Sequence, residues 1–326
     1  MDDPNPSFLL GFYRSIFKKS PELWQLNIDR LLQHEKLVIH YSNFICTGKV
    51  QESHLNQLLT LIKNNKLSVN AANVLGYGRA TELLDSSEIT KFCLQLSALG
   101  EEASWIALNA IYMYCFNHKD HAVNLRDTLV ELVLAVPLHK GLRLHVTDMH
   151  HWHDLAERLL KTNDTQFAIA LTMQMIKATE RDLDHSNIWN YFKPLLLQLM
   201  GDYAHVLWPL FGDAILKAKG RQRYWLQQLL DRENSLVSNL PSVLSAVPVN
   251  QIMQWCSQHP EAGPIFVARC LNIFETDMET RKPSILFVSL LENFGADQRV
   301  GAELEANMAT RGWSGSLVPY LLDDKK

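Results

Sequence analysis

The sequence predicts an all-α protein, a right-handed α-solenoid of stacked antiparallel helix pairs. Three observations predict this fold. Apolar residues recur at helical spacing along nearly the whole chain, no convincing stretch of strict apolar–polar alternation is bounded by hairpin turns, and one apolar pattern repeats at a spacing in the mid-thirties. A helix pair cannot bury its apolar face alone, so pairs of this length are expected to stack on their neighbours.

The repeating pattern consists of three apolar sets, each of which would share one face of a helix. The second set begins 34 residues after the first, and the third begins 36 residues after the second. Periods of this length are typical of HEAT-like and TPR-like helical repeats. The sets are Leu55, Leu58, Leu59 and Ile62; Ile89, Phe92, Cys93 and Leu96; and Leu125, Leu129 and Leu132.

Polar side chains that can cap a first helical turn mark several helix starts. Segments 85–88 and 163–166 each place a second polar group three residues after the first, and Pro21 follows Ser20 at a first helical position. Glycines after apolar runs mark helix ends. They are Gly100, Gly201 and Gly295.

These signals divide the chain into helices joined by short connections, with longer interruptions at 136–147 and 275–283. We expect one helical repeat domain over 1–326, which can be divided into sub-arrays 1–137 and 148–326. The predicted helices are 7–18, 21–33, 36–46, 51–64, 67–76, 86–99, 102–116, 122–136, 148–161, 164–179, 187–199, 202–218, 221–231, 234–245, 248–257, 261–274, 283–294 and 297–310.

The composition suits a folded chain without a general attraction to nucleic acid. Hydrophobic residues make up 47% of the sequence and charged residues 20%, which leaves ample apolar surface for a core. The formal net charge is -4, so the chain as a whole does not attract polyanions. We therefore expect a protein partner and no membrane contact.

The cysteines and the apolar runs indicate the cytoplasm. The five cysteines are odd in number, far apart and embedded in apolar helical patterns, as expected for reduced thiols in a core. Neither signal-peptide blocks nor an apolar run near the roughly 20 residues that span a bilayer occur in the sequence. We expect a cytoplasmic protein.

Motifs for catalysis are absent from the sequence. Gly-x-Ser-x-Gly, a Walker-type phosphate loop and Gly-x-Gly-x-x-Gly do not occur. The glycine-rich segment 76–79 falls between predicted helices, where a tight turn explains it. We expect no enzyme activity and no cofactor.

A cluster of histidines and aspartates within ten residues is the most prominent chemical feature. Imidazoles and carboxylates bind zinc or iron. A metal-dependent enzyme is therefore one hypothesis, ranked third after the protein-binding and nucleic-acid-binding hypotheses given below. A helical metal pair needs ligands at i and i+4, whereas the histidines at 150, 151 and 153 point in three directions. We expect a polar helix N-terminus or a partner-binding surface instead, with Trp152 as the candidate exposed anchor and Asp148 as the cap before the helix. The cluster comprises His145, Asp148, His150, His151, His153 and Asp154, and the predicted protein-binding residues are His150, His151, Trp152 and His153.

A basic and aromatic group supports the second hypothesis, a helical-repeat protein that binds nucleic acid. Cations can contact phosphates and an aromatic ring can stack on a base. Cations at a helix C-terminus also complement the backbone dipole, which explains Lys217 and Lys219 without a ligand. Trp105 and Trp225 fit core stripes. The predicted nucleic-acid-binding residues are Lys217, Lys219, Arg221, Arg223 and Tyr224.

Two segments carry more specific motifs. The first is Leu75-Gly76-Tyr77-Gly78-Arg79-Ala80, followed by Leu83, Leu84, a helix from Ser87, and Gly100 before the next helix. The second begins with Leu290-Leu291-Glu292-Asn293-Phe294-Gly295 and continues with Leu304-Glu305-Ala306-Asn307-Met308. It ends with Gly312-Trp313-Ser314-Gly315-Ser316-Leu317 and Tyr320. Together they resemble the helical C-terminal regions of large bacterial STAND-type NTPases that act in antiphage defence.

The resemblance implies a sensor array that recognises a foreign protein, such as a phage protein, for attached NTPase and effector modules. This chain lacks both modules and stops at Lys326, before a final helix that usually follows in such arrays, so we expect a fragment of a longer protein. No functional residue is transferred by the resemblance. The leading hypothesis is a non-catalytic protein-binding scaffold, the ligand-sensing region of a bacterial antiviral defence protein.

Overall fold

The computed structural model describes residues 7–77, 79–117, 124–139, 146–181, 183, 188–230, 242–274 and 282–310. Across these residues the regular structure is helical, and the single β pairing is an isolated bridge between Phe274 and Pro283. The all-α prediction is therefore confirmed for the described part of the chain. No helix within it combines the length and the apolarity needed to cross a membrane. The right-handed serial stacking stays a prediction.

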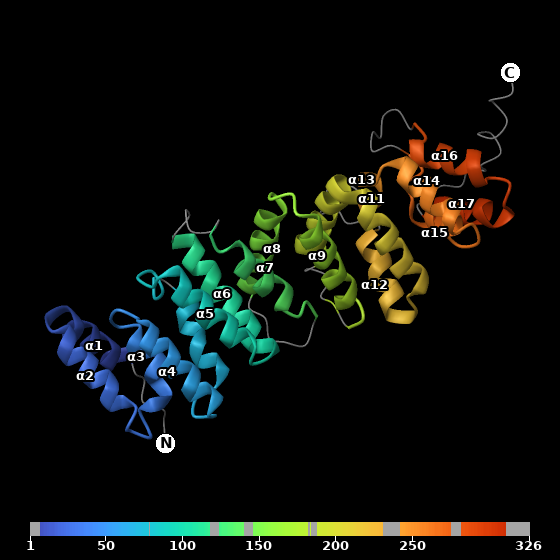
Figure 1. Ribbon diagram of the computed structural model, residues 1–326. Helices are drawn as coiled ribbons and strands as arrows, with labels where there is room; N and C mark the ends of the chain where they lie inside the picture. Colours follow the sequence, from blue (N-terminus) through green and yellow to red (C-terminus); the bar gives the residue numbers. More distant parts are fainter. Residues whose placement is uncertain are drawn as a thin grey trace. The chain divides into compact units, whose positions relative to one another are not determined.

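The chain forms two compact units, the first of which comprises Met1–Pro137 and Leu142–Thr162. Its helices pack mainly on their neighbours along the chain: α1 on α2, α4 on α5, α5 on α6, and α7 on both α6 and α8 (Figure 1). The elements are α1 (Ser7–Lys19), α2 (Pro21–Leu31), η1 (Val38–His40), α3 (Tyr41–Ile45), α4 (Glu52–Lys63), η2 (Val69–Gly76), α5 (Ser86–Ser97), α6 (Glu101–Asn117), α7 (Arg126–Ala135) and α8 (Val146–Leu160).

The second unit comprises Leu138–Gly141 and Asn163–Lys326. The long helix α11 packs on α9, α12, α13 and α14, and α15 packs on α14, α16 and α17. The elements are α9 (Thr165–Ala178), the π-helical turn η4 (Ile188–Phe192), α11 (Lys193–Lys217), α12 (Gly220–Leu230), α13 (Val243–Ala246), α14 (Val249–Gln258), α15 (Gly263–Cys270), α16 (Ile285–Phe294) and α17 (Gln298–Thr310).

The helix starts that the sequence predicts are confirmed. The Ser20 hydroxyl accepts a hydrogen bond from the Leu23 N–H, and Pro21 occupies the first position of α2. Asp85 and Glu88 form a reciprocal capping box at the start of α5. The Asp164 carboxylate accepts two backbone N–H bonds at the start of α9. Each cap satisfies donors that a first turn leaves unpaired.

The three repeating apolar sets all lie in the core. Every member, from Leu55 to Ile62 in α4, from Ile89 to Leu96 in α5 and from Leu125 to Leu132 at α7, is 5% exposed or less. The periodic pattern therefore identified the inward faces of these helices correctly. Trp105 and Trp225 are buried as well, as predicted.

Four predicted helices take a different form. Segment 67–76 forms the 3₁₀-helix η2, and 36–46 divides into the 3₁₀ turn η1 and the short helix α3. Asparagine competes for backbone hydrogen bonds in helix interiors, which accounts for the tighter winding of the asparagine-containing η2. Helices 187–199 and 202–218 are joined within α11, where Gly201 precedes a kink at Tyr203 instead of a loop. Most of 234–245 lies outside the described residues.

All five cysteines are free thiols. Cys46 is half-buried, whereas Cys93, Cys115, Cys256 and Cys270 are buried. Burial raises the pKa of the Cys46 and Cys256 thiols to about 12 and that of Cys115 to about 11. A buried thiol with a raised pKa is a poor nucleophile and packs as a small apolar side chain.

Candidate functional site

The histidines of α8 divide between the surface and the packing contact with α6. His150 is exposed, whereas the His151 ring stacks on Tyr112 with ring centroids 3.9 Å apart. The Nδ1 atom of His151 lies 2.8 Å from Oδ1 of Asn109. Burial lowers the pKa of His151 and of His153, so both imidazoles favour the neutral form.

Asn109 connects α6 to α8 through two hydrogen bonds. Its Nδ2 donates to Asp148 Oδ1 at 2.7 Å, and its Oδ1 accepts from His151. Asp148 is buried in the first turn of α8, which begins at Val146, so the prediction that it lies before the helix start was wrong. This arrangement holds α6 and α8 together. Of His150 and His151, only His150 is exposed.

The prediction that Trp152 is an exposed anchor was wrong. Its side chain is 0% exposed, and its indole Nε1 donates to the backbone oxygen of Val133 in α7 at 3.3 Å. Because α8 packs on both α6 and α7, this side of the helix faces the core. A stripe at alternating spacings of three and four would have identified it, since successive helical residues point about 100° apart. The stripe is Met149, Trp152, Ala156 and Leu159.

The described part of the cluster does not assemble a metal site. No group of three His, Cys, Asp or Glu side chains gathers at metal-binding distance among the described residues. His145 lies outside them. Asp154 instead forms an ion pair with Arg158, one turn further along α8.

The predicted nucleic-acid-binding residues lie at the corner between α11 and α12. Lys217, Lys219 and Arg221 are exposed and Arg223 is half-buried. Tyr224 is 46% exposed, so it is the aromatic ring that a base can reach. Asp213 lies nearby on α11 and accepts a hydrogen bond from the Trp255 indole at 3.0 Å.

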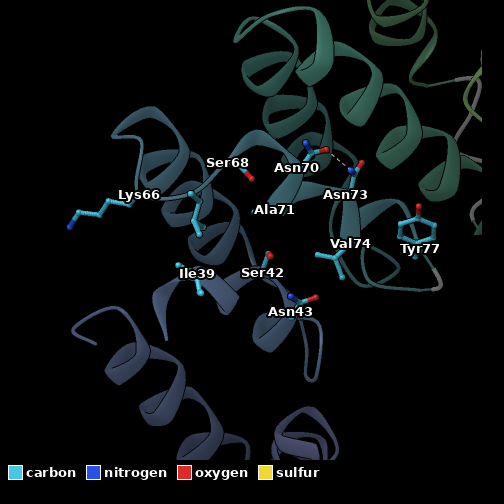
Figure 2. A pocket seen from close by; sticks show the side chains of 11 residues that line it. Ile39, Ser42, Asn43, Lys66, Ser68, Asn70, Ala71, Asn73, Val74 and Tyr77 are labelled. Carbon is cyan, nitrogen blue, oxygen red and sulfur yellow. Dashed lines mark hydrogen bonds between the residues drawn. The ribbon is translucent and has the colours of Figure 1, made fainter. Parts of the chain in front are cut away.

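Sequence reasoning missed a cleft of about 600 Å³ in the first unit. One wall consists of η1 and α3, and the other consists of η2 and the chain that leads into it (Figure 2). The polar lining residues are hydroxyl and amide side chains, and the single charged one, Lys66, extends away from the cleft in Figure 2. They include Ser42, Asn43, Ser68, Asn70 and Asn73.

Hydrogen bonds fix one wall of the cleft and leave the other open. Asn73 Nδ2 donates to Asn70 Oδ1 at 2.9 Å, and Asn70 Nδ2 donates to Glu102 of α6 at 2.6 Å. On the opposite wall, neither Ser42 nor Asn43 makes a side-chain hydrogen bond to any described residue. The residues that line the cleft come from two segments about thirty positions apart, so no local motif predicts the cleft. The only sequence signal for it was a pair of asparagines, Asn70 and Asn73, three positions apart in 67–76.

A second unpredicted feature is an apolar surface on α1 and α2. We name it the α1–α2 face and define it as Phe8, Leu9, Phe12, Leu23 and Leu26, with exposed fractions of 83%, 40%, 55%, 47% and 47%. The other side of the pair is packed: Phe17 meets Trp24 edge to face at 5.2 Å, and Tyr13 contacts Phe44 at 4.5 Å between centroids. Apolar periodicity predicts such helices but does not reveal which apolar side chains lack a neighbour.

Comparisons with known proteins give no match: no protein-family model matches the chain, and neither do any curated proteins or solved structures. Function is therefore inferred from the α1–α2 face, the cleft, the basic residues between α11 and α12, and the motif resemblance.

Proposed function

We propose that the chain is a non-catalytic protein-binding scaffold, and the observation that carries this is the α1–α2 face. Five large apolar side chains from two packed helices are each at least 40% exposed there. Single exposed apolar residues are ordinary, but several on two helices that pack together are typical of a region that another protein covers. Aromatic side chains such as Phe8 and Phe12 are suited to act as interface anchors.

The proposal extends to the role that the motif resemblance implies. The chain would be the ligand-sensing region of a bacterial antiviral defence protein in the cytoplasm, and an attached NTPase would respond when a foreign protein binds. The support is the pair of segments at 75–100 and 290–308, both built of apolar helices with glycine at their turns. Residues 312–320 of the second segment lie outside the described part of the chain.

The test is a binding screen against a library of phage proteins, followed by substitution on the α1–α2 face. Phe12→Glu places a charge in the proposed contact, and we expect it to weaken binding of the selected protein by at least about a hundredfold, as loss of a central anchor does. Gln95→Glu, at an exposed position of α5, adds the same charge away from the face and is the matched control.

Three results would count against the scaffold proposal. The first is a screen in which the folded wild-type chain selects no protein. The second is a selected protein that binds the Phe12→Glu and wild-type chains equally. The third is a selected protein that is lost equally with Gln95→Glu, because general charge would then explain the effect.

Nucleic-acid binding is the second candidate function, and the exposed cations beside Tyr224 favour it. Fluorescence anisotropy with labelled single-stranded and duplex oligonucleotides tests it. Binding through this corner requires a steep loss of affinity as salt rises, and a further loss on changing Arg221 and Arg223 to alanine. Affinity that is insensitive to both changes would eliminate this candidate.

A further inference from the structure

The cleft between α3 and η2 is lined by a hydroxyl that makes no hydrogen bond to a described residue. Ser42 is 1% exposed, yet its Oγ makes no hydrogen bond to any described residue. Figure 2 shows the hydroxyl on the α3 wall, directed toward the η2 wall across the cleft. Ser42 Oγ is not one of the fully buried unpaired polar atoms of the described residues, so it opens onto the cleft, where a bound ligand can form a hydrogen bond with it.

The lining is neutral and offers both donors and acceptors. Asn43 has a free amide on the same wall as Ser42, and the Asn73 amide retains its oxygen after donating to Asn70. No carboxylate is among the described residues that line the cleft, and Lys66 extends away from it in Figure 2. A phosphate or another strongly charged ligand would lack a counter-ion here, because such ligands are bound by cations or by backbone N–H groups.

Apolar side chains complete the lining. Ile39 and Val74 come from opposite walls, and Leu67 and Ala71 line the cleft as well. A side-chain amide presents one carbonyl and one NH₂ group, which match the N–H and C=O groups of a peptide main chain. An extended peptide would pair its main chain with the amides and place alternate side chains against the apolar residues. The volume of about 600 Å³ suits a short segment of this kind.

We propose that this cleft binds an extended, uncharged peptide segment whose main chain pairs with Ser42 and Asn43. The site goes beyond the proposed function, since it uses none of the residues of the α1–α2 face. It adds a second contact with a partner of different chemistry, a linear segment in place of an apolar surface.

The probe is a pooled library of N-acetylated, C-amidated heptapeptides made from uncharged residues, applied to the whole chain. We expect wild-type protein to enrich a subset of peptides relative to Ala71→Leu, which fills the cleft. The enriched peptides should bind about three- to tenfold more weakly to Asn43→Ala and to Ser42→Ala, as expected for the loss of one hydrogen bond. Asn64→Ala is the matched control, because Asn64 is exposed at the end of α4 and does not line the cleft.

Peptides resynthesised with N-methyl groups on the main chain test the pairing directly. Loss of affinity on N-methylation supports the proposal, and the circular dichroism spectra of all variants establish that they are folded. The proposal is overturned if wild-type protein and Ala71→Leu enrich the same peptides or none. The proposal is also overturned if the enriched peptides bind Asn43→Ala and Ser42→Ala as tightly as they bind wild-type protein. The same holds if N-methylated peptides bind wild-type protein as tightly as the unmethylated ones do. Phe12→Glu should leave peptide binding within about twofold of wild type, so failure of the scaffold proposal would be distinguishable from failure here.

Discussion

Helices α1 and α6 are both rich in apolar residues, but their surroundings differ. In α6, 11 of 17 residues are buried, and its main contacts are α5, α7, α8 and η2. In α1, none of residues 8–19 is buried, and its main contacts are α2 and α3. The comparison teaches that apolar spacing predicts a helix, whereas burial depends on how many neighbours the fold supplies. Apolar residues of α1 are therefore available to a partner.

The largest expected effect comes from truncating one side chain in each helix. Leu108→Ala in α6 removes a side chain that is 0% exposed and should lower the free energy of unfolding by about 2–5 kcal/mol. Phe12→Ala in α1 removes a side chain that is 55% exposed and should change it by less than about 0.5 kcal/mol. Urea denaturation followed by circular dichroism measures both. A large loss of stability in Phe12→Ala would show that α1 is packed more tightly than its exposure indicates.

Gly48 lies against the packed side of the α1–α2 pair, and Gly11 lies on the open side of α1. A Cβ at Gly48 would lie 2.6 Å from Trp24 and 2.7 Å from Phe17, so Gly48→Ala should destabilise the chain by about 1–3 kcal/mol. A Cβ at Gly11 meets nothing within 4 Å, so Gly11→Ala should stabilise α1 by about 0.5–1 kcal/mol through helix propensity. Thermal unfolding of the two variants compares them. Shifts of the same sign would contradict this assignment of the two sides.

The polar bridge between α6 and α8 should contribute less than the apolar core. Asn109→Ala removes the hydrogen bonds to Asp148 and His151 and should cost about 1–3 kcal/mol. Gln95→Ala, at an exposed position of α5, is the control and should be nearly neutral. If urea denaturation gives the two variants equal stability, the bridge does not stabilise the packing of α6 on α8.

The smallest expected effect is a pH dependence of stability. Burial, and secondarily the charge of His150, lowers the pKa of His151 below its ordinary value of 6.5. Between the folded and unfolded pKa values the unfolded chain binds more protons, so this contribution to stability is complete above pH 6.5 and decreases as the pH falls below it. His151→Asn keeps a donor for Asn109 and cannot titrate, so it should flatten the pH dependence. Burial also lowers the pKa of His54, and the slope should therefore fall only in part.

The sequence predicted the local features of the fold well. The capping groups at Ser20, Asp85 and Asp164 act within three residues of themselves, so spacing alone identifies them. The repeating apolar sets were identified because helical periodicity records which residues share a face. The prediction for Trp152 was wrong because the histidines beside it indicate a polar surface, whereas the apolar stripe to which it belongs faces the core.

The candidate surfaces could not be predicted in the same way. Ser42 and Asn73 line one cleft although 31 positions separate them, and their proximity depends on how α3 packs on η2. The α1–α2 face depends on which neighbours α1 lacks. Both are properties of tertiary contacts, which apolar periodicity in a single sequence does not contain.

The free cysteines give this chain internal reporters of transient opening. Three of them lie in the first unit, at 46, 93 and 115, and two lie in the second, at 256 and 270. An alkylating reagent reaches a buried thiol only when the surrounding helices separate, so the labelling rates of the four buried cysteines measure how often their surroundings open. The half-buried Cys46 is accessible without such opening. Mass spectrometry of timed alkylation would therefore rank the two units by local stability without any amino-acid substitution. A bound partner would be detected as slower labelling in the unit that it covers.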